Sequence, residues 1–377
     1  MDLELASPLG NFQLQRLPFR KNELLRAWDA ADEYLLNQLA AAGIAEHANI
    51  VILNDSFGAL AVSLSAYRPT AVSDSWLSQQ ATRINLALND IDHERVRLLD
   101  SLSLPEAGID YLLIKIPKTL ALLEYQLHAL KPLLKADCQL IAAGMVKSLP
   151  PTAWILLERL IGPTQPSLAV KKARLIFARL DPNLQLPANP YPTRYPLENS
   201  DLTFCNHANV FSRDSLDIGT RFLLEHLPQN SEYYDFIDLG CGNGIVGVML
   251  AKQNPSARIG FIDESFMAIA SARENFAAAF ADSRQADFLV ADCLSDYPEN
   301  SADCIVCNPP FHQQHTIGDH IAWQMFRQAH KVLRQGGELR VIGNRHLNYH
   351  LPLKKLFGNC RQVAANAKFV IFSCIKS

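Results

Sequence analysis

The sequence lacks long hydrophobic runs: no uninterrupted apolar segment approaches the roughly 20 residues that a membrane-spanning helix requires. It also opens without the apolar core of a secretory signal peptide. Eight cysteines are present, but none of their spacings resembles a disulfide framework, which suits a reducing compartment. We therefore expect a soluble cytoplasmic protein, a monomer without a membrane partner.

Metal and redox chemistry also have little support in the sequence. His312, His315 and His320 lie close together, but no cysteine or carboxylate group completes a ligand spacing apart from Asp319. Cys304 and Cys307 resemble a redox pair. If both lie on one extended strand, however, their Cα atoms are about 10 Å apart, too far for a disulfide. We expect no metal, and we interpret both cysteines as strand residues.

The chain has no excess of positive charge, since its formal net charge is only −3. The charges are unevenly distributed: residues 1–110 carry 8 basic and 15 acidic side chains, whereas residues 111–180 carry 10 and 3. Clustered cations are typical of phosphate binding, although a solvated charged face is the alternative. The basic segment supplies the candidate RNA contacts Lys115, Lys118, Lys171, Lys172 and Arg174.

Three glycines follow a short apolar strand and precede a helical pattern at residues 245–250. Glycines remove the Cβ atoms that would keep a ligand away from a tight turn, and they tolerate positive φ. Asp263 ends the next apolar run, where its carboxylate can accept hydrogen bonds from two ribose hydroxyls. We predict a nucleoside-cofactor site that includes Asp238, Gly240, Gly242, Asn243, Gly244 and Asp263.

The glycines alone do not identify the cofactor. Residues 242–247 also fit G-x-G-x-x-G with an acid about 20 residues later, as in dinucleotide-binding folds. NAD and S-adenosylmethionine therefore both remain open at this point. A tight turn without a ligand is the third interpretation, and the density of glycines argues against it.

Asn308-Pro309-Pro310-Phe311 favours S-adenosylmethionine, because a nicotinamide enzyme has no use for this motif. The Asn308 side-chain oxygen and the Pro309 carbonyl can each accept an N–H from a planar amine, which aims its lone pair at a methyl group. Pro309 and Pro310 stiffen the loop, and Phe311 offers a face for a flipped-out base. We predict that these four residues are catalytic and that Asn308 also contacts the cofactor; an ordinary Pro-Pro loop is the alternative.

Strands and helices alternate in the second half, which is typical of an α/β fold. We predict strands at residues 236–238, 259–262, 287–290, 304–307 and 338–343, and helices at 266–280 and 321–333, with Gly336-Gly337 ending the latter. Residues 360–363 and 369–375 form an expected terminal hairpin. Five prolines in residues 181–199 indicate a linker between domains at 1–180 and 200–377.

The two halves look like copies of one fold. The patterns align Asn54 with Asp238, Ser56 with Gly240, Asp74 with Asp263 and Ile116 with Asn308. In this alignment the first copy has lost the glycine turn and the amine acceptor but has gained lysines. We therefore expect the first half to dock RNA and the second half to carry out the chemistry.

The motifs together resemble a known family. Residues 206–213, 216–219, 238–244, 308–315 and 343–347, with 27–34 and 53–55 in the first half, are similar to class I, Rossmann-like methyltransferases that use S-adenosylmethionine. More narrowly, the chain resembles the bacterial ribosomal RNA guanine-N2 methyltransferases built from two tandem domains. The resemblance implies two such domains, the first degenerate, and nearly the whole chain takes part in it.

The resemblance also implies the reaction, which is methyl transfer to the exocyclic N2 amine of a guanine in ribosomal RNA. Overall likeness favours 23S over 16S RNA. The family places Phe211 in a segment lining the substrate pocket and Asp292 near the adenine amine. Two alternatives remain: a methyltransferase for protein glutamine amides, which typically has tyrosine where this chain has Phe311, and a non-catalytic RNA scaffold, in which both sites would be eroded.

Overall fold

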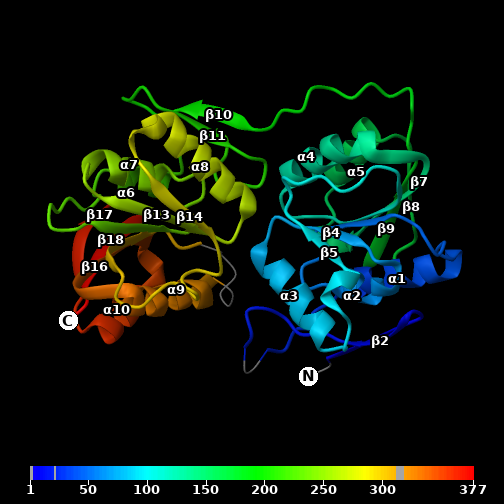
Figure 1. Ribbon diagram of the computed structural model, residues 1–377, viewed down its shortest axis with the longest axis horizontal. Helices are drawn as coiled ribbons and strands as arrows, with labels where there is room; N and C mark the ends of the chain where they lie inside the picture. The colour runs from blue at the N-terminus through cyan, green and yellow to red at the C-terminus, as the bar shows by residue number, and fades with distance from the viewer. Residues whose placement is uncertain (1–2, 21–22, 311–317) are drawn as a thin grey trace. The chain divides into compact units, whose positions relative to one another are not determined.

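The computed structural model describes residues 3–20, 23–310 and 318–377. The chain folds into two compact units, residues 1–191 and 192–377 (Figure 1). Residues 181–191 belong to the first unit, where the Tyr191 hydroxyl donates to Glu124 at 2.9 Å. Strand β10 (Thr193–Pro196) of the second unit begins two residues later, inside the range expected for a linker.

A seven-stranded mixed sheet forms the centre of the second unit, in the order β14-β13-β12-β15-β16-β18-β17. Neighbouring strands are parallel except where β18 pairs with β16 and β17. Its strands are β12 (Asp235–Leu239), β13 (Arg258–Asp263), β14 (Ala286–Val290), β15 (Ala302–Cys307), β16 (Leu333–Asn344), β17 (Arg361–Ala365) and β18 (Phe369–Ile375). The connections change direction at β12, and ligands of α/β sheets bind at the carboxyl ends of strands beside such a switch point.

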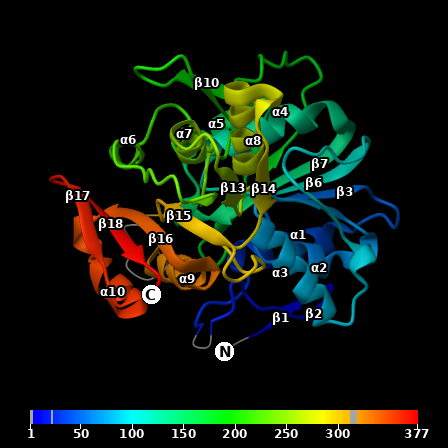
Figure 2. The same cartoon turned by 60° about the vertical axis from the view of Figure 1, so that its left-hand side comes forward.

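Helices cover both faces of this sheet (Figures 1 and 2). One face packs on α6 (Ile218–Leu224), α7 (Ile245–Gln253) and α8 (Phe266–Phe280), and the other on α9 (Gly318–Val332) and α10 (His350–Phe357). The α8 helix shows why the sequence folds this way: the Ser265 hydroxyl accepts the Ala268 N–H at its start, and Ala268, Ala272 and Phe276 bury one stripe. Short turns at Ala281–Ser283 and Arg345–Leu347, and a hairpin of β10 with β11 (Thr203–Asn206), complete the unit.

The first unit repeats the same sheet, in the order β5-β4-β3-β6-β7-β9-β8, with the same parallel and antiparallel pairs. The strands of this sheet are β3 (Ile50–Leu53), β4 (Thr70–Val72), β5 (Arg97–Leu99), β6 (Ile109–Lys115), β7 (Leu134–Met145), β8 (Thr164–Pro166) and β9 (Ala173–Ala178). Before them, β1 (Glu4–Ser7) and β2 (Gly10–Gln13) form a separate hairpin. The helices of this unit are α1 (Ala30–Ala42), α2 (Ala59–Ser63), α3 (Trp76–Ala87), α4 (Leu120–Leu130) and α5 (Pro151–Leu160), with single turns at Ser65–Tyr67, His93–Arg95, Lys131–Leu133 and Val146–Ser148. The prediction of two tandem Rossmann-like domains is confirmed.

The alignment of the two copies differs from the one predicted. Strand pairing places Leu53 beside Ile114 in the first sheet and Leu239 beside Cys307 in the second, so Lys115 corresponds to Asn308. The predicted match of Ile116 to Asn308 was therefore wrong by one residue. The match of Asn54 to Asp238 was wrong by two, because Asn54 and Gly240 both follow the central strand and both have positive φ, 62° and 71°.

Strand pairing also changes which residue of the first unit corresponds to Asp263, the acid at the end of β13. Val72 and Ile262 are paired with the corresponding residues of the central strands, so Asp263 corresponds to Ser73 and not to Asp74. Helices α3 and α8 agree with this register, because the side chains of Ser75 and Ser265 cap them in the same way. Sequence similarity misplaced these residues because loop lengths differ, whereas hydrogen-bonded registers do not drift.

The predicted elements of the second half are present, with one correction. Helix α9 ends at Val332, and Gly336 and Gly337 lie inside β16 rather than ending the helix. The Gly336 N–H donates to the Lys376 carbonyl and the Lys376 N–H donates to the Gly337 carbonyl, at 2.8 and 2.9 Å. The glycines therefore lie where the register of β16 against β15 shifts, between Leu333 and Glu338, with φ +79° at Gly336.

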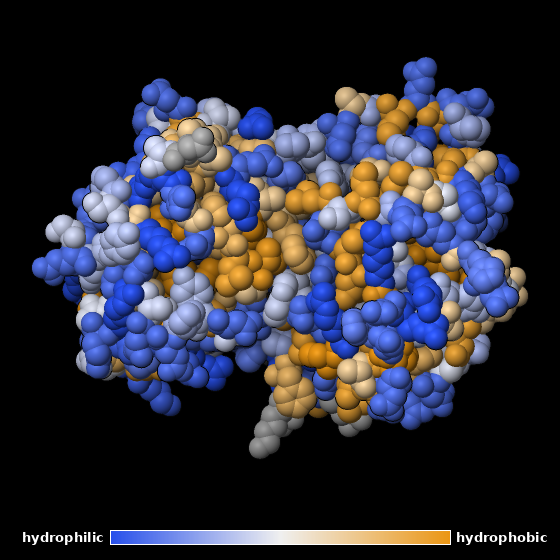
Figure 3. All heavy atoms as spheres, in the orientation of Figure 1, coloured by the Kyte–Doolittle hydropathy of each residue, from blue (hydrophilic) through white to orange (hydrophobic). Residues whose placement is uncertain are grey.

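All eight cysteines are free thiols, as the sequence predicts, and Cys304 and Cys307 are buried in β15. Not every apolar side chain is inside: Phe19, Leu24 and Leu168 are largely exposed. The visible face of each unit accordingly mixes hydrophobic and hydrophilic residues (Figure 3).

Candidate active site

Four predicted site residues lie in a row at the carboxyl ends of neighbouring strands in the second unit. Gly240 directly follows β12, Asp263 is the last residue of β13, and Asn308 directly follows β15. Asp292 lies two residues beyond the end of β14, where the neighbouring Ala291 N–H donates to the Asp263 carbonyl at 3.0 Å. The fold thus brings the predicted cofactor residues and the predicted amine acceptor to one edge of the sheet.

The glycine turn after β12 has the conformation expected from the sequence. Gly240, Gly242 and Gly244 have φ of +71°, +53° and +79°. At Gly242 a Cβ atom would meet nothing within 4 Å, so the bare backbone borders open space. At Gly244, which caps α7, a Cβ atom would lie 2.7 Å from the Ala272 Cβ. Gly242 therefore leaves room for a ligand, whereas Gly244 lets helix α8 approach the turn.

Asp263 joins the glycine turn to the next strand. Its Oδ2 accepts the Gly242 N–H at 2.9 Å, and its Oδ1 accepts the Ser265 N–H at 3.0 Å. Burial raises the pKa of this carboxyl group, and the backbone N–H donors oppose that shift. A carboxylate has about four acceptor positions, so lone pairs remain for two ribose hydroxyls.

Two other predicted cofactor residues carry structural bonds. Asp238 is buried, and its Oδ2 accepts the Gly247 N–H at 2.8 Å; burial raises the pKa of this side chain to about 8. The Asn243 side chain donates to the Tyr195 hydroxyl and to Asn206 Oδ1, both at 2.9 Å. Its Oδ1 also accepts the N–H of Ile245 at 3.1 Å. The Asn243 amide is thus occupied, and only its backbone can face a ligand.

Asn308 directly follows β15, and the nitrogen of its side-chain amide is hydrogen-bonded whereas the oxygen is not. Its Nδ2 donates to the Thr220 hydroxyl at 3.1 Å. Its Oδ1 is shielded from solvent, yet it has no hydrogen-bond partner in the part of the chain that the structure describes. A buried acceptor without a donor costs about 1–3 kcal/mol, so such an atom indicates a missing partner.

The surroundings of Asn308 agree with a substrate pocket. Pro309 is buried and Pro310 is half-buried. Phe311, together with His312 and His315, lies outside the described residues. Phe211 is 69% exposed in the loop between β11 and α6, available to a planar partner.

The equivalent edge of the first unit is filled by its own side chains. Lys115 stands where Asn308 stands in the second unit, and its ammonium group lies 2.8 Å from Asp29 and 2.7 Å from Asp32. Its side chain is only 15% exposed. Lys115 is therefore paired with two acids inside the domain, which leaves its ammonium little capacity for a phosphate, and its contact with RNA stays a prediction.

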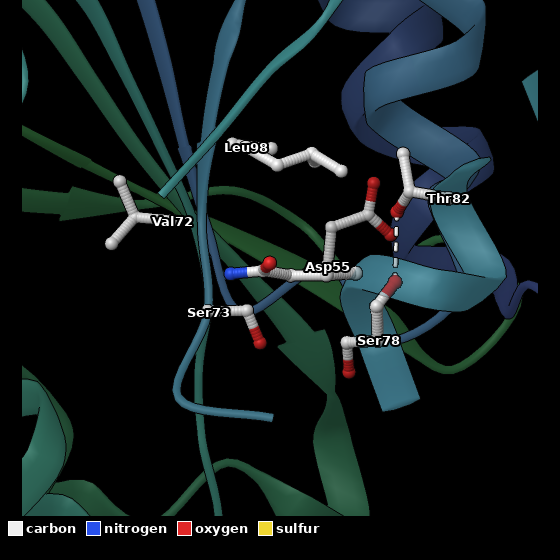
Figure 4. Close-up of a pocket in the computed structure, with 8 residues that line it drawn as sticks. Asp55, Val72, Ser73, Ser78, Thr82 and Leu98 are labelled. Atoms are coloured by element: carbon white, nitrogen blue, oxygen red, sulfur yellow. Dashed lines mark hydrogen bonds between the residues drawn. The ribbon is translucent and has the colours of Figure 1, made fainter. Parts of the chain in front are cut away.

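Asp55 fills the place of the glycine turn in the first unit. Its two oxygens accept the N–H groups of Gly58, Ala59, Leu60 and Ala61 at 2.9–3.1 Å. The carboxylate faces a small pocket that Val72, Ser73, Ser78, Thr82 and Leu98 also line (Figure 4). With Ser73 in place of Asp263 and Asp55 across the turn, this edge lacks the strand-end carboxylate and the open glycine turn of its counterpart.

The remaining basic candidates gather at the same end of the first sheet. Lys118 follows β6 and is exposed, and Lys171 and Lys172 form the two-residue turn before β9. Lys171 pairs with Glu33 at 2.7 Å but is 71% exposed. Arg174, within β9, is half-buried. Exposed Lys147 follows the neighbouring strand β7 and adds to this group, which was absent from the predicted contacts.

Thr220 is the contact that sequence reasoning missed. The pattern Asp217-x-x-Thr220 is visible in the sequence as a helix start, and in the structure Asp217 caps α6 by accepting the Thr220 N–H at 2.8 Å. Its proximity to Asn308 could not be read from the sequence, because 88 positions separate the two residues.

Among the residues that the structure describes, no group of three or more histidine, cysteine, aspartate and glutamate side chains could hold a metal ion. Within residues 3–20, 23–310 and 318–377, no helix has both the length and the apolar character needed to cross a bilayer.

Comparison with known proteins agrees with this geometry. The family description "RLMG N-terminal domain" matches residues 2–182, and "Methyltransferase small domain" matches residues 201–373. A solved structure of the T. thermophilus 16S rRNA N2 methyltransferase, in complex with AdoMet and guanosine, is similar with a TM-score of 0.77 at 20% identity. The alignment covers 99% of this chain and 97% of that one, which shows a shared two-domain fold.

Relatives of nearly equal length are more similar in sequence. "Ribosomal RNA large subunit methyltransferase G" of Pseudomonas aeruginosa is 50% identical, with 98% of this chain and 99% of the relative covered. Proteins of the same name from Streptomyces avermitilis and Erwinia tasmaniensis are both 48% identical, with at least 99% of each chain covered. The chain therefore belongs to the ribosomal RNA large subunit methyltransferase G family.

Proposed function

We propose that this protein transfers a methyl group from S-adenosylmethionine to the exocyclic N2 amine of one guanine in 23S ribosomal RNA. The observation that carries the proposal is the unpartnered Oδ1 of Asn308, a shielded acceptor at the end of β15 beside the glycine turn. The names of the relatives support the choice of large-subunit RNA, and the name of the structural neighbour supports the guanine N2 position.

The residues of the second unit fit S-adenosylmethionine. Gly242 borders open space that a Cβ atom would enter, and Asp263 retains acceptor positions for the ribose hydroxyls. Asp292, beyond the neighbouring strand, is available to the adenine amine. When bound, S-adenosylmethionine supplies an electrophilic methyl group, so the protein's main task is alignment.

Asn308 and Pro309 provide this alignment on the substrate side. The Asn308 Oδ1 and the Pro309 carbonyl accept the two N–H groups of the guanine amine, which turns the nitrogen lone pair out of conjugation. The same acceptors stabilise the positive charge that develops on nitrogen during transfer. No strong base is required before attack, because the amine becomes acidic only as the methyl group arrives. Phe311 and Phe211 supply faces on which the extruded base and its neighbours stack.

The first unit acts as the RNA-docking module in this proposal. It has kept the sheet, it has lost the acceptor and the glycine turn, and it displays Lys118, Lys147, Lys171 and Lys172 at one end of that sheet. Phosphate contacts supply affinity without reading sequence, so the guanine is selected at the second unit. We propose that the protein acts as a monomer in the cytoplasm, where ribosomal RNA is modified.

Mapping N2-methylguanine in ribosomal RNA tests the proposal. RNA from cells that lack the protein should lose one N2-methylguanine from 23S RNA and none from 16S RNA. Purified protein with S-adenosylmethionine should restore that position in vitro, on either naked 23S RNA or assembled large subunits. Loss of N2-methylguanine from 16S RNA, or methylation of a protein glutamine in place of 23S RNA by the purified protein, would overturn the proposed substrate.

A further inference from the structure

Asn308 can act as proposed only in one of two orientations. A half-turn about the last side-chain bond exchanges Oδ1 and Nδ2 with almost no change of shape. With Oδ1 toward the substrate, the side chain accepts an N–H from the guanine amine. With Nδ2 there, two donors face each other and the amine is repelled. Something must therefore keep the nitrogen side turned away from the substrate.

The geometry points to Thr220 and Asp217 as positioning residues that hold the Asn308 amide in its productive orientation. This inference rests on the proposed function, because it explains how the acceptor of that reaction is kept available. Asp217 Oδ2 lies 3.3 Å from the Thr220 hydroxyl, which in turn lies 3.1 Å from Asn308 Nδ2.

The direction of each hydrogen bond in this chain follows from chemistry. An ionised carboxylate can only accept, so the Thr220 hydroxyl donates its single proton to Asp217. The Thr220 oxygen is then left as an acceptor and takes the N–H of Asn308. The reversed amide would place Oδ1 against a hydroxyl whose proton is already committed. The relay therefore selects one orientation and leaves Oδ1 of Asn308 free for the substrate.

The relay is held rigidly at the start of helix α6. The Thr220 backbone N–H donates to the same Asp217 Oδ2 at 2.8 Å, as in an ordinary helix cap. Thr220 is 8% exposed, so water does not compete freely for its hydroxyl. Gly219 leaves room for the carboxylate, since a Cβ atom there would lie 3.0 Å from Asp217 Oδ2.

The first unit has contacts at the corresponding positions, but they are made by different side chains. Asp29 caps α1 as Asp217 caps α6, and Asp32 stands three residues later as Thr220 does. The strand-end residue there is Lys115, bonded to both acids. The contact between this helix start and this strand end thus belongs to the ancestral fold. Only the second unit combines it with a threonine and an amide, the pair that leaves an acceptor open.

Substitution of Thr220 tests the inference in the full-length protein. Thr220→Val keeps the shape and removes the hydroxyl, so kcat on 23S RNA should fall about tenfold, as expected for the loss of one buried hydrogen bond. KM for RNA and Kd for S-adenosylmethionine should change less than about twofold, because neither depends on the amide orientation. Thr220→Ser should restore kcat to near the wild-type value. Unimpaired cofactor binding also shows that each variant is folded.

Two controls separate positioning from general stability. Thr82→Val removes a buried threonine hydroxyl of α3, bonded to the Ser78 carbonyl at 2.9 Å, and should leave kcat unchanged. In an Asn308→Ala background, Thr220→Val should cause no further loss, because there is no amide left to orient. If Thr220→Val fails to fold, Thr220→Ala serves in the same comparison.

The outcomes are distinct. Wild-type kcat in Thr220→Val and Thr220→Ala, an additive loss with Asn308→Ala, or no rescue by serine would overturn the positioning role. Undiminished turnover in Asn308→Ala alone would instead refute the proposed function of the acceptor on which the inference rests.

Discussion

Asn85 and Asn275 make the same hydrogen bonds in their two domains. Asn85 Nδ2 donates to the Phe57 carbonyl at 2.7 Å, and Asn275 Nδ2 donates to the Asn243 carbonyl at 2.9 Å. Asn85 Oδ1 accepts the N–H of Gln15, two residues after β2, and Asn275 Oδ1 accepts the N–H of Cys205 in β11. Each asparagine therefore links the hairpin at the start of its domain, β1–β2 or β10–β11, to the turn after the central strand, β3 or β12.

These shared hydrogen bonds predict where a folded second domain must begin. A fragment of residues 192–377 keeps β10 and β11, including Tyr195, whose hydroxyl accepts from Asn243, and should fold and bind S-adenosylmethionine. A fragment of residues 207–377 loses both strands and should bind cofactor weakly or not at all. The longer fragment should methylate 23S RNA poorly for want of a docking domain. Calorimetry and methyl-transfer assays check both expectations, and full activity of the longer fragment would contradict the docking role.

Asp263→Ala should weaken S-adenosylmethionine binding by about 1–3 kcal/mol, the cost of leaving hydrogen-bonding groups unpaired. The matched control is Ser73→Ala, which changes the corresponding position of the first domain and should leave cofactor affinity unaltered. Isothermal titration calorimetry measures both. Equal affinities of the wild type and Asp263→Ala would show that this acid does not hold the ribose.

The turn of Lys171 and Lys172 predicts that RNA binding and stability can be changed in opposite directions. Both lysines have positive φ, 48° and 64°, between the paired residues Val170 and Ala173. Asn-Gly suits such a turn, so the double change Lys171→Asn with Lys172→Gly should stabilise the protein by about 1 kcal/mol. It should also weaken RNA binding and flatten the salt dependence by about 0.7–0.9 in log–log slope for each lost phosphate contact.

Thermal unfolding and RNA binding at several salt concentrations check this prediction. Lys135→Ala provides the control, because Lys135 is exposed at the opposite end of the same sheet. It should leave RNA affinity unchanged. RNA binding by the double variant equal to that of wild type would remove this turn from the docking surface.

The buried Asp238 predicts how stability depends on pH. Burial raises its pKa to about 8, whereas an unfolded chain ionises aspartate near pH 3.9. Between these two pKa values the folded protein holds a proton that the unfolded chain releases, so this contribution to stability is fully present below about pH 3.9, falls as pH rises, and is gone above about pH 8. In Asp238→Asn the melting temperature should fall less between about pH 5.5 and 8.5 than in the wild type. Parallel pH profiles for the two proteins would contradict the raised pKa.

Much of this architecture could be predicted from residue patterns. The spacing of apolar residues located the strands of the second half, and helix α8 spans the predicted residues 266–280. The glycine turn and the Asn308 motif predicted the candidate site because glycine and proline impose backbone geometry locally.

What escaped prediction depends on contacts between distant parts of the chain. Lys115 looked like a surface cation, but Asp29 and Asp32, more than 80 positions earlier, neutralise it. The partner of Asn308 was missed for the same reason, since Thr220 reaches it only through the packing of α6 near the end of β15. The alignment of the two copies was wrong by one or two positions because the loops differ in length between the copies, and only the strand pairing reveals the true equivalents.

The Asp55 side chain occupies the turn after the central strand of the first domain. Its carboxylate accepts four backbone N–H groups at the start of α2. In the second domain the corresponding N–H groups of Gly244, Ile245 and Gly247 donate to three separate acceptors, the Cys241 carbonyl, Asn243 Oδ1 and Asp238 Oδ2. A single side chain therefore closes the turn of the first domain, which needs no ligand there, whereas a second domain that binds S-adenosylmethionine as proposed gains stability as the methyl donor becomes more abundant. With RNA docking assigned to the first domain as proposed, the protein should still hold its RNA when the methyl donor runs low, so RNA binding would not depend on the metabolite that limits catalysis.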